Sequence, residues 1–266
     1  MAFATYHDLW LEAGDPEPMA RFWAGALCLD AQSLSGGAYR LGSPRPEQTI
    51  YVVPADPGTL RGFRIHADVD LGQLAAIRWL GAEPEGDEED PWLVLHGPED
   101  SELRCYPSPE PIPDRRYEMV LPATQPIRAA RWWARVFGAV YESAAGGDYA
   151  WVSQVPHAPF ETLLFTDAGS LPAHRRVRMR LTTADMPGLI RYGAAMVSGQ
   201  LPWVPTGEPG GPGGSGEPSG SGLDAPGRPT YVMRCAEGVE FIVVDVSGAP
   251  ESARSPRPAK PALGPR

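Results

Sequence analysis

The chain has 266 residues, of which 42% are apolar, which suffices for one large domain or two small ones. Its net charge of −10 and pI of about 5.0 argue against nucleic acid as a partner, because phosphate binding needs a clustered basic surface. No stretch approaches the roughly 18 consecutive apolar residues of a membrane helix, so we expect no membrane association.

The N-terminus lacks the basic start and long apolar stretch of a signal peptide, so we expect a soluble cytoplasmic protein. Only Lys260 is a lysine among the 23 basic residues, and Ala, Gly and Pro are abundant, which indicates GC-rich codons and a bacterial source. The three cysteines are far apart and form no CxxC pair, which fits a reducing compartment and small buried side chains rather than disulfides or structural zinc: Cys28, Cys105 and Cys235.

The first elements in chain order are a strand over residues 6–11 and a helix over residues 16–27. Asp15 is a candidate N-cap, and Pro16 suits the first helical turn, where its missing N–H costs nothing. Apolar residues recur at helical spacing and form one stripe, as expected for a helix packed on a core: Met19, Phe22, Trp23, Ala26 and Leu27.

Short strand-like segments follow this helix, and the same order then starts again. The predicted strands are residues 29–33, 38–42 and 48–53. The second cycle has a strand at 63–70, a helix at 71–81, and strands at 91–97 and 102–107.

The second half repeats this order with an offset of 110 residues. Ala20-Arg21-Phe22-Trp23-Ala24 returns as Ala130-Arg131-Trp132-Trp133-Ala134, and Pro16 returns as Pro126. The apolar stripe recurs in the same phase: Ala129, Trp132, Trp133, Val136 and Phe137. The pattern predicts, in order, a strand at 117–121, a helix after Pro126, strands at 139–143, 149–155, 160–166 and 175–185, a helix at 186–196, and strands at 231–235 and 239–246.

Three segments interrupt or end this pattern. Residues 108–114 are a Pro-rich linker between a first domain at 3–107 and a second at 115–246. A Gly-, Pro- and Ser-rich insertion at 204–229 and the tail at 247–266 are expected to be disordered. The insertion is a tolerated surface loop or a functional lid; for a tolerated loop, deletion of residues 207–227 leaves the melting temperature nearly unchanged.

Several of these segments resemble the glyoxalase-like proteins of the vicinal oxygen chelate superfamily, which includes bleomycin resistance proteins and extradiol dioxygenases. DPEPMARFWAGALCLD resembles the first helix of such domains, with Leu27-Cys28 in place of their usual Leu-Gly turn. HADVDLGQLAAIRWLGAEP resembles the start of their second unit, and GPEDSELRCY and AEGVEFIVVD resemble their closing hairpins.

The resemblance implies an α+β fold of tandem domains, built from four βαβββ units that pair into half-open curved sheets around pockets. It leaves the pairing open: each half closes on itself, or exchanges units with the other half or with a partner chain. Family enzymes hold a divalent metal in the pocket, with ligands from the first and last strands of each unit.

In the first half, the metal-ligand candidates are His7, His66 and Glu102. Two histidines and one carboxylate suit a non-haem iron site. The register of the resemblance instead places ligand positions at Asp8 and Arg104, and Arg104 disfavours a cation. A strand histidine held only by hydrogen bonds is the alternative for His66.

In the second half, the equivalent positions are Glu118, Arg180 and Ile242. An arginine at the position of His66 removes a metal-binding lone pair. Because Arg176, Arg178 and Arg180 alternate along one strand, they share a face and form either an anion-binding surface or a solvated one.

Three strand tryptophans, Trp10, Trp92 and Trp151, are candidates to line a pocket, with plain core packing as the alternative. We expect the helical tryptophans Trp23, Trp132 and Trp133 to lie in the core. No catalytic residue is assigned, because the GxSxG, GxxxxGK[ST], HExxH and strand-GxGxxG patterns are absent.

Three functions fit these patterns. The first is a binder of a small aromatic or apolar molecule, with a degenerate metal site and no assigned cofactor. The second is a lyase, isomerase or dioxygenase that uses Fe, Mn, Ni or Zn in the first-domain pocket. The third is a structural module with vestigial pockets. A homodimer is compatible with all three.

Overall fold

The computed structural model describes residues 2–42, 48–56, 63–85, 92–112, 117–167, 177–198 and 229–247. They form four consecutive modules, each with a strand, a helix and three further strands. Module 1 consists of β1 (Thr5–Ala13), α1 (Pro16–Leu27), β2 (Asp30–Ser33), β3 (Tyr39–Gly42) and β4 (Ile50–Pro54).

The other three modules repeat this order. Module 2 consists of β5 (Arg64–Asp70), α2 (Leu71–Trp79), β6 (Glu83–Glu85), β7 (Leu93–His96) and β8 (Glu102–Ser108). Module 3 consists of β9 (Tyr117–Ala123), α3 (Pro126–Phe137), β10 (Val140–Ser143), β11 (Tyr149–Ser153) and β12 (Phe160–Asp167). Module 4 consists of β13 (Val177–Thr183), α4 (Met186–Arg191), β14 (Ala195–Ser198), β15 (Thr230–Arg234) and β16 (Glu240–Asp245).

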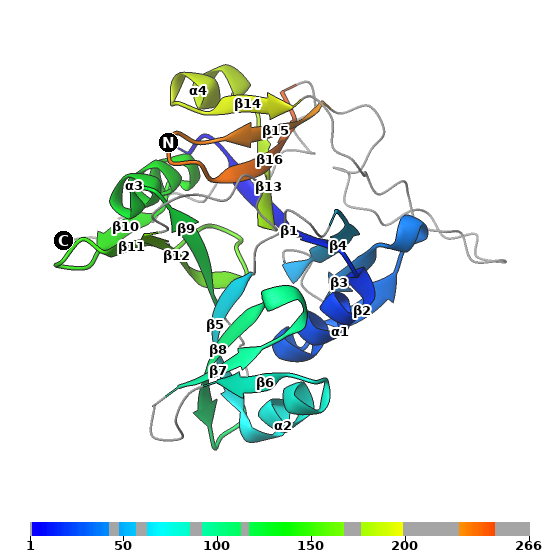
Figure 1. Cartoon of the computed structure of the whole chain (residues 1–266). Helices are drawn as coiled ribbons and strands as arrows, with labels where there is room; N and C mark the ends of the chain where they lie inside the picture. The colour runs from blue at the N-terminus through cyan, green and yellow to red at the C-terminus, as the bar shows by residue number, and fades with distance from the viewer. Residues whose placement is uncertain are drawn as a thin grey trace, which may run out of the picture.

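The modules pair across the two halves of the chain into two curved, open sheets. Sheet A, with the order β14-β15-β16-β13-β1-β4-β3-β2, joins module 1 to module 4. Sheet B, with the order β10-β11-β12-β9-β5-β8-β7-β6, joins modules 2 and 3. The seams are the antiparallel pairs β1–β13 and β5–β9 (Figure 1). Of the pairings left open by the sequence, the structure adopts exchange between the halves.

The expected α+β class and the four βαβββ units are confirmed. The division into domains at 3–107 and 115–246 stays a prediction. β8, which ends at Ser108, and β9, which follows the expected linker, lie in the same sheet. The insertion at 204–229 and the tail at 247–266 fall almost entirely outside the described residues.

The helices over residues 16–27 and from Pro126 onward form as expected, with their apolar stripes buried. The helix predicted at 186–196 forms and begins at Met186, but its predicted C-terminal end is wrong. α4 ends at Arg191, and Gly193 has a φ of +99°, a backbone conformation that ends the helix before the edge strand β14. Asp15 occupies the N-cap position of α1, but its side chain makes no capping hydrogen bond.

Each sheet has an outer face that packs against helices and an opposite, inner face. Strand side chains alternate between them, so the outer faces carry the core, with fully buried residues such as Leu9, Ile65, Met119 and Leu181. The helical tryptophans pack into this core: Trp23 and Trp133 are fully buried, and Trp132 is 7% exposed. The inner faces carry the polar residues considered below.

The free cysteines differ in burial. Cys105 and Cys235 are buried, as expected, and burial raises the pKa of the Cys105 thiol to about 11. The prediction is wrong for Cys28, which is exposed because it occupies the left-handed C-cap position of α1, with a φ of +53°.

A carboxylate from one module binds backbone N–H groups directly before a helix of its neighbour along the chain. Glu99 lies in the turn between β7 and β8, and its side chain accepts hydrogen bonds from the backbone N–H groups of Gly14 (3.1 Å) and Asp15 (2.8 Å). The equivalent residue of module 4, Glu237, lies 3.3 Å from Arg128 in the first turn of α3. Modules that do not share a sheet are therefore tied together at their helix starts.

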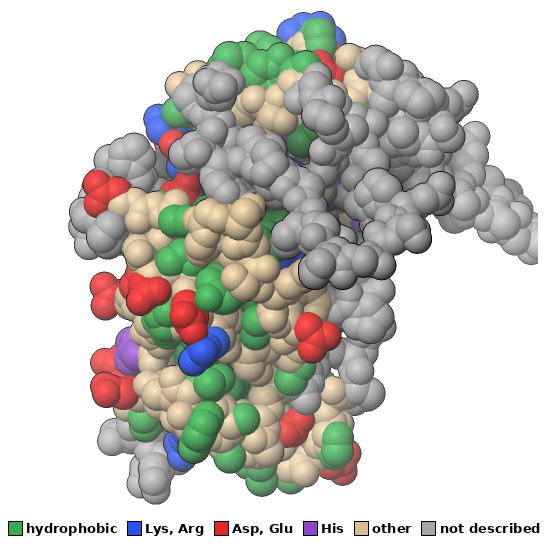
Figure 2. Space-filling view, turned by 90° about the vertical axis from the view of Figure 1, so that its right-hand side faces the viewer, with side chains coloured by type: hydrophobic (Ala, Val, Ile, Leu, Met, Phe, Trp, Pro, Cys, Tyr) green, Lys and Arg blue, Asp and Glu red, His purple; other side chains and the backbone are tan. Residues whose placement is uncertain are grey.

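None of the helices in the described ranges is long and apolar enough to cross a membrane. On the face drawn in Figure 2, acidic side chains gather along one edge of the described surface, in line with the acidic composition.

Candidate functional site

The inner face of each sheet carries one row of side chains across its central strands. In sheet A, Asp8 pairs in register with Arg180, which pairs with Ile242. In sheet B, His66 pairs with both Glu118 and Arg104. These are the six positions that the resemblance assigned as ligand positions, so the fold brings them together in two sets of three.

The row in sheet A is closed by an ion pair. Arg180 Nε lies 3.0 and 2.9 Å from the two carboxylate oxygens of Asp8, and its Nη2 also contacts the carboxylate. The side chains of Asp8 and Arg180 are 1% and 5% exposed. The guanidinium lies 5.8 Å from the Trp10 ring and 5.5 Å from the Tyr51 ring, which adds cation–π contacts.

Two opposing effects set the pKa of Asp8. Burial alone would raise the pKa of this carboxyl, but Arg180 and the His7 ring, whose Nδ1 lies 2.6 Å away, lower it below its ordinary value. Asp8 is therefore held as a carboxylate whose oxygens are already used by neighbours.

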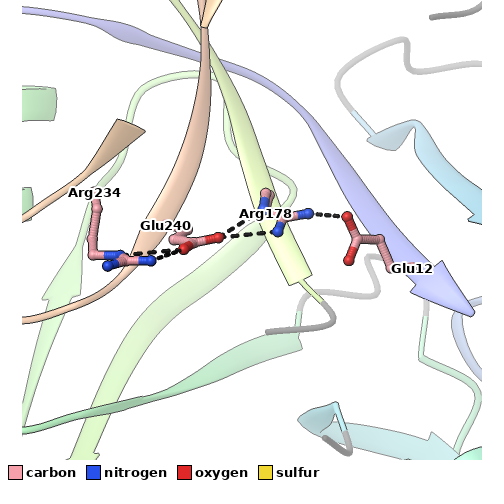
Figure 3. A network of polar contacts seen from close by, with 4 residues as sticks. All are labelled: Glu12, Arg178, Arg234 and Glu240. Atoms are coloured by element: carbon pink, nitrogen blue, oxygen red, sulfur yellow. Dashed lines mark hydrogen bonds and ion pairs between the residues drawn. The ribbon is translucent and has the colours of Figure 1, made fainter. Parts of the chain in front are cut away.

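A second polar network lies on the same inner face. Arg178 contacts Glu12 and lies 3.0 Å from Glu240, which also contacts Arg234. Figure 3 shows the unbroken chain from Glu12 to Arg234. Burial raises the pKa of Glu240, but the hydrogen bonds and charges of Arg234 and Arg178 outweigh it and lower the pKa overall. Arg178 and Arg180 thus bind carboxylates of the chain itself, whereas Arg176 lies outside the described residues.

The row in sheet B is less complete. His66 Nδ1 lies 3.2 Å from Glu118 Oε2, but Nε2, which is buried, has no hydrogen-bond partner among the described residues. The buried Arg104 Nε also lacks one there. Arg104 Nη2 lies 3.8 Å from Glu102, beyond hydrogen-bonding distance, while Glu102 accepts a 2.5 Å bond from Arg64.

The rows also differ in exposure. The side chains of Glu118 and Arg104 are 41% and 31% exposed, whereas that of His66 is 10% exposed. The described hollows at the ends of α3 and α4 lie on the helical side of the molecule and not over either row. Sheet B therefore has buried, unsatisfied polar atoms flanked by side chains that solvent reaches.

The three strand tryptophans lie in different surroundings. Trp10 is buried at 3% exposure in a cluster on the inner face of sheet A with Ala38, Tyr51, Val53 and Ile242. Trp92 is half-buried beside β7, with the Arg104 guanidinium 5.7 Å from its ring. Trp151 is half-buried on β11 and donates a 2.9 Å hydrogen bond to Glu142. Trp92 therefore flanks the sheet B row.

The metal-ligand candidates of the first half are divided between the sheets. His7 and Asp8 lie on β1 of sheet A, whereas His66 and Glu102 lie on β5 and β8 of sheet B. The cause is the exchange of modules, which a strand pattern along one half does not reveal.

Neither row fits a catalytic divalent metal, which takes three protein ligands and an open position. In the described ranges, no group of three His, Cys, Asp or Glu side chains could hold one. In sheet A, Arg180 uses the Asp8 oxygens and Ile242 has no lone pair. In sheet B, His66 and Glu118 are two suitable donors, and Arg104 adds a repelling charge.

Sequence reasoning missed some inner-face residues, namely Glu12, Tyr51 and Arg64. Glu12 and Arg64 can be found by counting in steps of two along a strand, from Asp8 to Glu12 and from His66 back to Arg64. Tyr51 needs the β1–β4 register, in which it pairs with Trp10.

The fold and the rows define a protein of paired βαβββ modules with ligand-type positions on two inner faces. Residues 8–105 match the model of the glyoxalase-like domain family. A search of curated protein sequences found no match. The predicted resemblance to glyoxalase-like domains is confirmed by this match over residues 8–105, and the solved structures below share the fold.

Two of the similar solved structures cover nearly the whole chain. Glyoxalase I from Zea mays is 10% identical, with a TM-score of 0.56 over 91% of this chain and 92% of its own. A candidate dioxygenase from Bacillus subtilis is 12% identical, with a TM-score of 0.54 over 92% of this chain and 86% of its own. At these identities the likeness establishes the fold alone.

Proposed function

We infer that this protein binds a small aromatic or apolar molecule, without a metal, on the inner face of sheet B. The carrying observation is a pair of buried atoms on neighbouring strands, His66 Nε2 and Arg104 Nε, that have no hydrogen-bond partner among the described residues. A buried polar atom without a partner costs roughly 1–3 kcal/mol, which a ligand that supplies the partner recovers.

The contrast with sheet A supports this assignment. There the equivalent residues Asp8 and Arg180 satisfy each other and are closed to solvent. In sheet B the row is open at Glu118 and Arg104 and is flanked by Trp92, which suits a ligand with an aromatic body. We therefore assign a structural role to the inner face of sheet A and binding to that of sheet B.

A thermal-shift screen with aromatic compounds tests the proposal. Compounds that stabilise the protein are then measured on L164R, which places a long cation on the inner face of sheet B, beside Trp151 and Val120 in register. The matched control is T182R, at a half-buried position on the inner face of sheet A. Stabilisation should be lost in L164R and kept in T182R.

Two outcomes contradict the proposal. Compounds that stabilise L164R as strongly as the unmodified protein would place binding elsewhere, and a broad library without any hit would favour a structural module. Metal analysis of protein purified without a histidine tag addresses the enzyme hypothesis: stoichiometric Fe, Mn, Ni, Co or Zn would favour a metal-dependent lyase, isomerase or dioxygenase instead. The homodimer stays a prediction, which size-exclusion chromatography with light scattering tests.

A further inference from the structure

The two unsatisfied atoms of the sheet B row have opposite hydrogen-bonding character. The Glu118 carboxylate only accepts, so it keeps the imidazole hydrogen of His66 on Nδ1, 3.2 Å away. His66 Nε2 is then an acceptor with a free lone pair. Arg104 Nε carries a hydrogen and is a donor. The row therefore offers one acceptor and one donor from side chains adjacent in register.

A single hydroxyl group complements this pair, because its oxygen accepts from Arg104 while its hydrogen is donated to His66. An ether or ketone oxygen could accept from Arg104 but would leave His66 Nε2 unsatisfied. An ammonium group could donate to His66 but would face the Arg104 charge. Among common polar groups on a small apolar molecule, the hydroxyl meets both requirements with one atom.

The charges around the row favour an acidic hydroxyl. Glu102 is bound to Arg64, and Glu118 is engaged with His66, whereas the Arg104 contact with Glu102 is 3.8 Å long. The Arg104 guanidinium thus stabilises negative charge that develops on a ligand oxygen. Phenols and enols place such charge on oxygen more readily than aliphatic alcohols. The ring of Trp92, 5.7 Å from the guanidinium, offers an aromatic surface beside it.

We propose that the Arg104–His66–Glu118 row recognises an acidic hydroxyl group, of phenol or enol type, on a small aromatic or apolar ligand. The Arg104 Nε–H donates to the hydroxyl oxygen, and the hydroxyl donates to His66 Nε2. Glu118 is a positioning residue that fixes the imidazole hydrogen on Nδ1. This assignment of ligand class rests on the proposed binding function of the same face.

The test compares phenol with anisole, in which a methyl ether replaces the hydroxyl. Phenol keeps its hydroxyl hydrogen at neutral pH, and dissociation constants are measured by equilibrium dialysis on the full chain. The unmodified protein should prefer phenol by about tenfold or more, the value of one well-made hydrogen bond to a charged group. In R104M and in H66L the preference should fall to about twofold or less. R21M removes the same charge from the exposed side of α1 and should keep the full preference.

Fold integrity is checked by the melting curve of each variant. Because the Arg104 side chain is 31% exposed, R104M carries the test should H66L fail to fold. Equal binding of both probes to the unmodified protein overturns the hydroxyl assignment and leaves the proposed binding function standing. A preference that survives in R104M also overturns the assignment. Binding of neither probe, together with a failed aromatic screen, overturns both proposals.

Discussion

Asp8 and Arg180 lie opposite each other on β1 and β13 and join the two halves of the chain through an ion pair that is almost fully buried. The same positions in sheet B hold Glu118 and His66, whose contact is longer and partly exposed. Two rows with a common origin in the repeat therefore have different chemistry, one closed on itself and one open to a ligand.

The Asp8→Asn substitution should destabilise the protein strongly. It leaves the Arg180 guanidinium buried without its counter-charge, a change that costs about 3–5 kcal/mol. The free energy of unfolding from urea denaturation is the measurement. The matched double variant D8L/R180M removes both charges and should be far less destabilised, since a buried pair replaced by apolar side chains is often neutral. A D8N protein as stable as the unmodified one would contradict this role.

Stability should fall in acid because the pKa values of Asp8 and Glu240 are lowered in the folded state. A carboxyl with a lowered folded-state pKa contributes stability above its unfolded value, about 4, and the contribution is lost as the pH falls from there through the folded value. Urea titrations between pH 7 and pH 2 measure the loss. E240Q should show a shallower decline than the unmodified protein, whereas E17Q, on an exposed helix pair, should not.

The Glu99 side chain belongs to module 2 and should stabilise the start of α1 in module 1. E99A removes the acceptor for the N–H groups of Gly14 and Asp15 and should cost about 1 kcal/mol, the net contribution of a typical hydrogen bond. E17A, in the first turn of the same helix, is the control for the removal of one carboxylate there. Equal effects of the two variants on the free energy of unfolding would show that Glu99 acts only through its charge.

The helices and most strands could be predicted because their signals are local. The apolar stripe from Met19 to Leu27 alone determines α1, and its copy at an offset of 110 determines α3. β6 was missed because Glu83-Pro84-Glu85 is an exposed edge strand without an apolar pattern. The boundary of α4 was detectable from Gly193, a residue that commonly follows a helix end.

The pairing of modules could not be predicted in this way. The alternation of side chains along β1 or β5 indicates which residues share a face of the sheet. It does not indicate which other strand each of them pairs with. The sets Asp8–Arg180 and His66–Glu118 therefore emerged only from the sheet order, although each residue had been singled out by register. The sequence gives no sign that His66 Nε2 and Arg104 Nε lack hydrogen-bond partners among the described residues, because this depends on which side chains the neighbouring strands place beside them.

The last prediction tests why the sheet B row does not fit a metal. Two features prevent metal binding on this interpretation: the positive charge of Arg104 and the lack of a third metal ligand. R104E removes that charge and adds a carboxylate ligand beside His66 and Glu118 in register. Mn²⁺ or Zn²⁺ should then raise the melting temperature of R104E, since a ligand at about 100 times its Kd adds about 2.7 kcal/mol of stability. The same ions should leave the unmodified protein and R21E unchanged. Equal stabilisation of the unmodified protein by either ion would show that Arg104 does not prevent metal binding, and would return the metal-dependent hypothesis to this site.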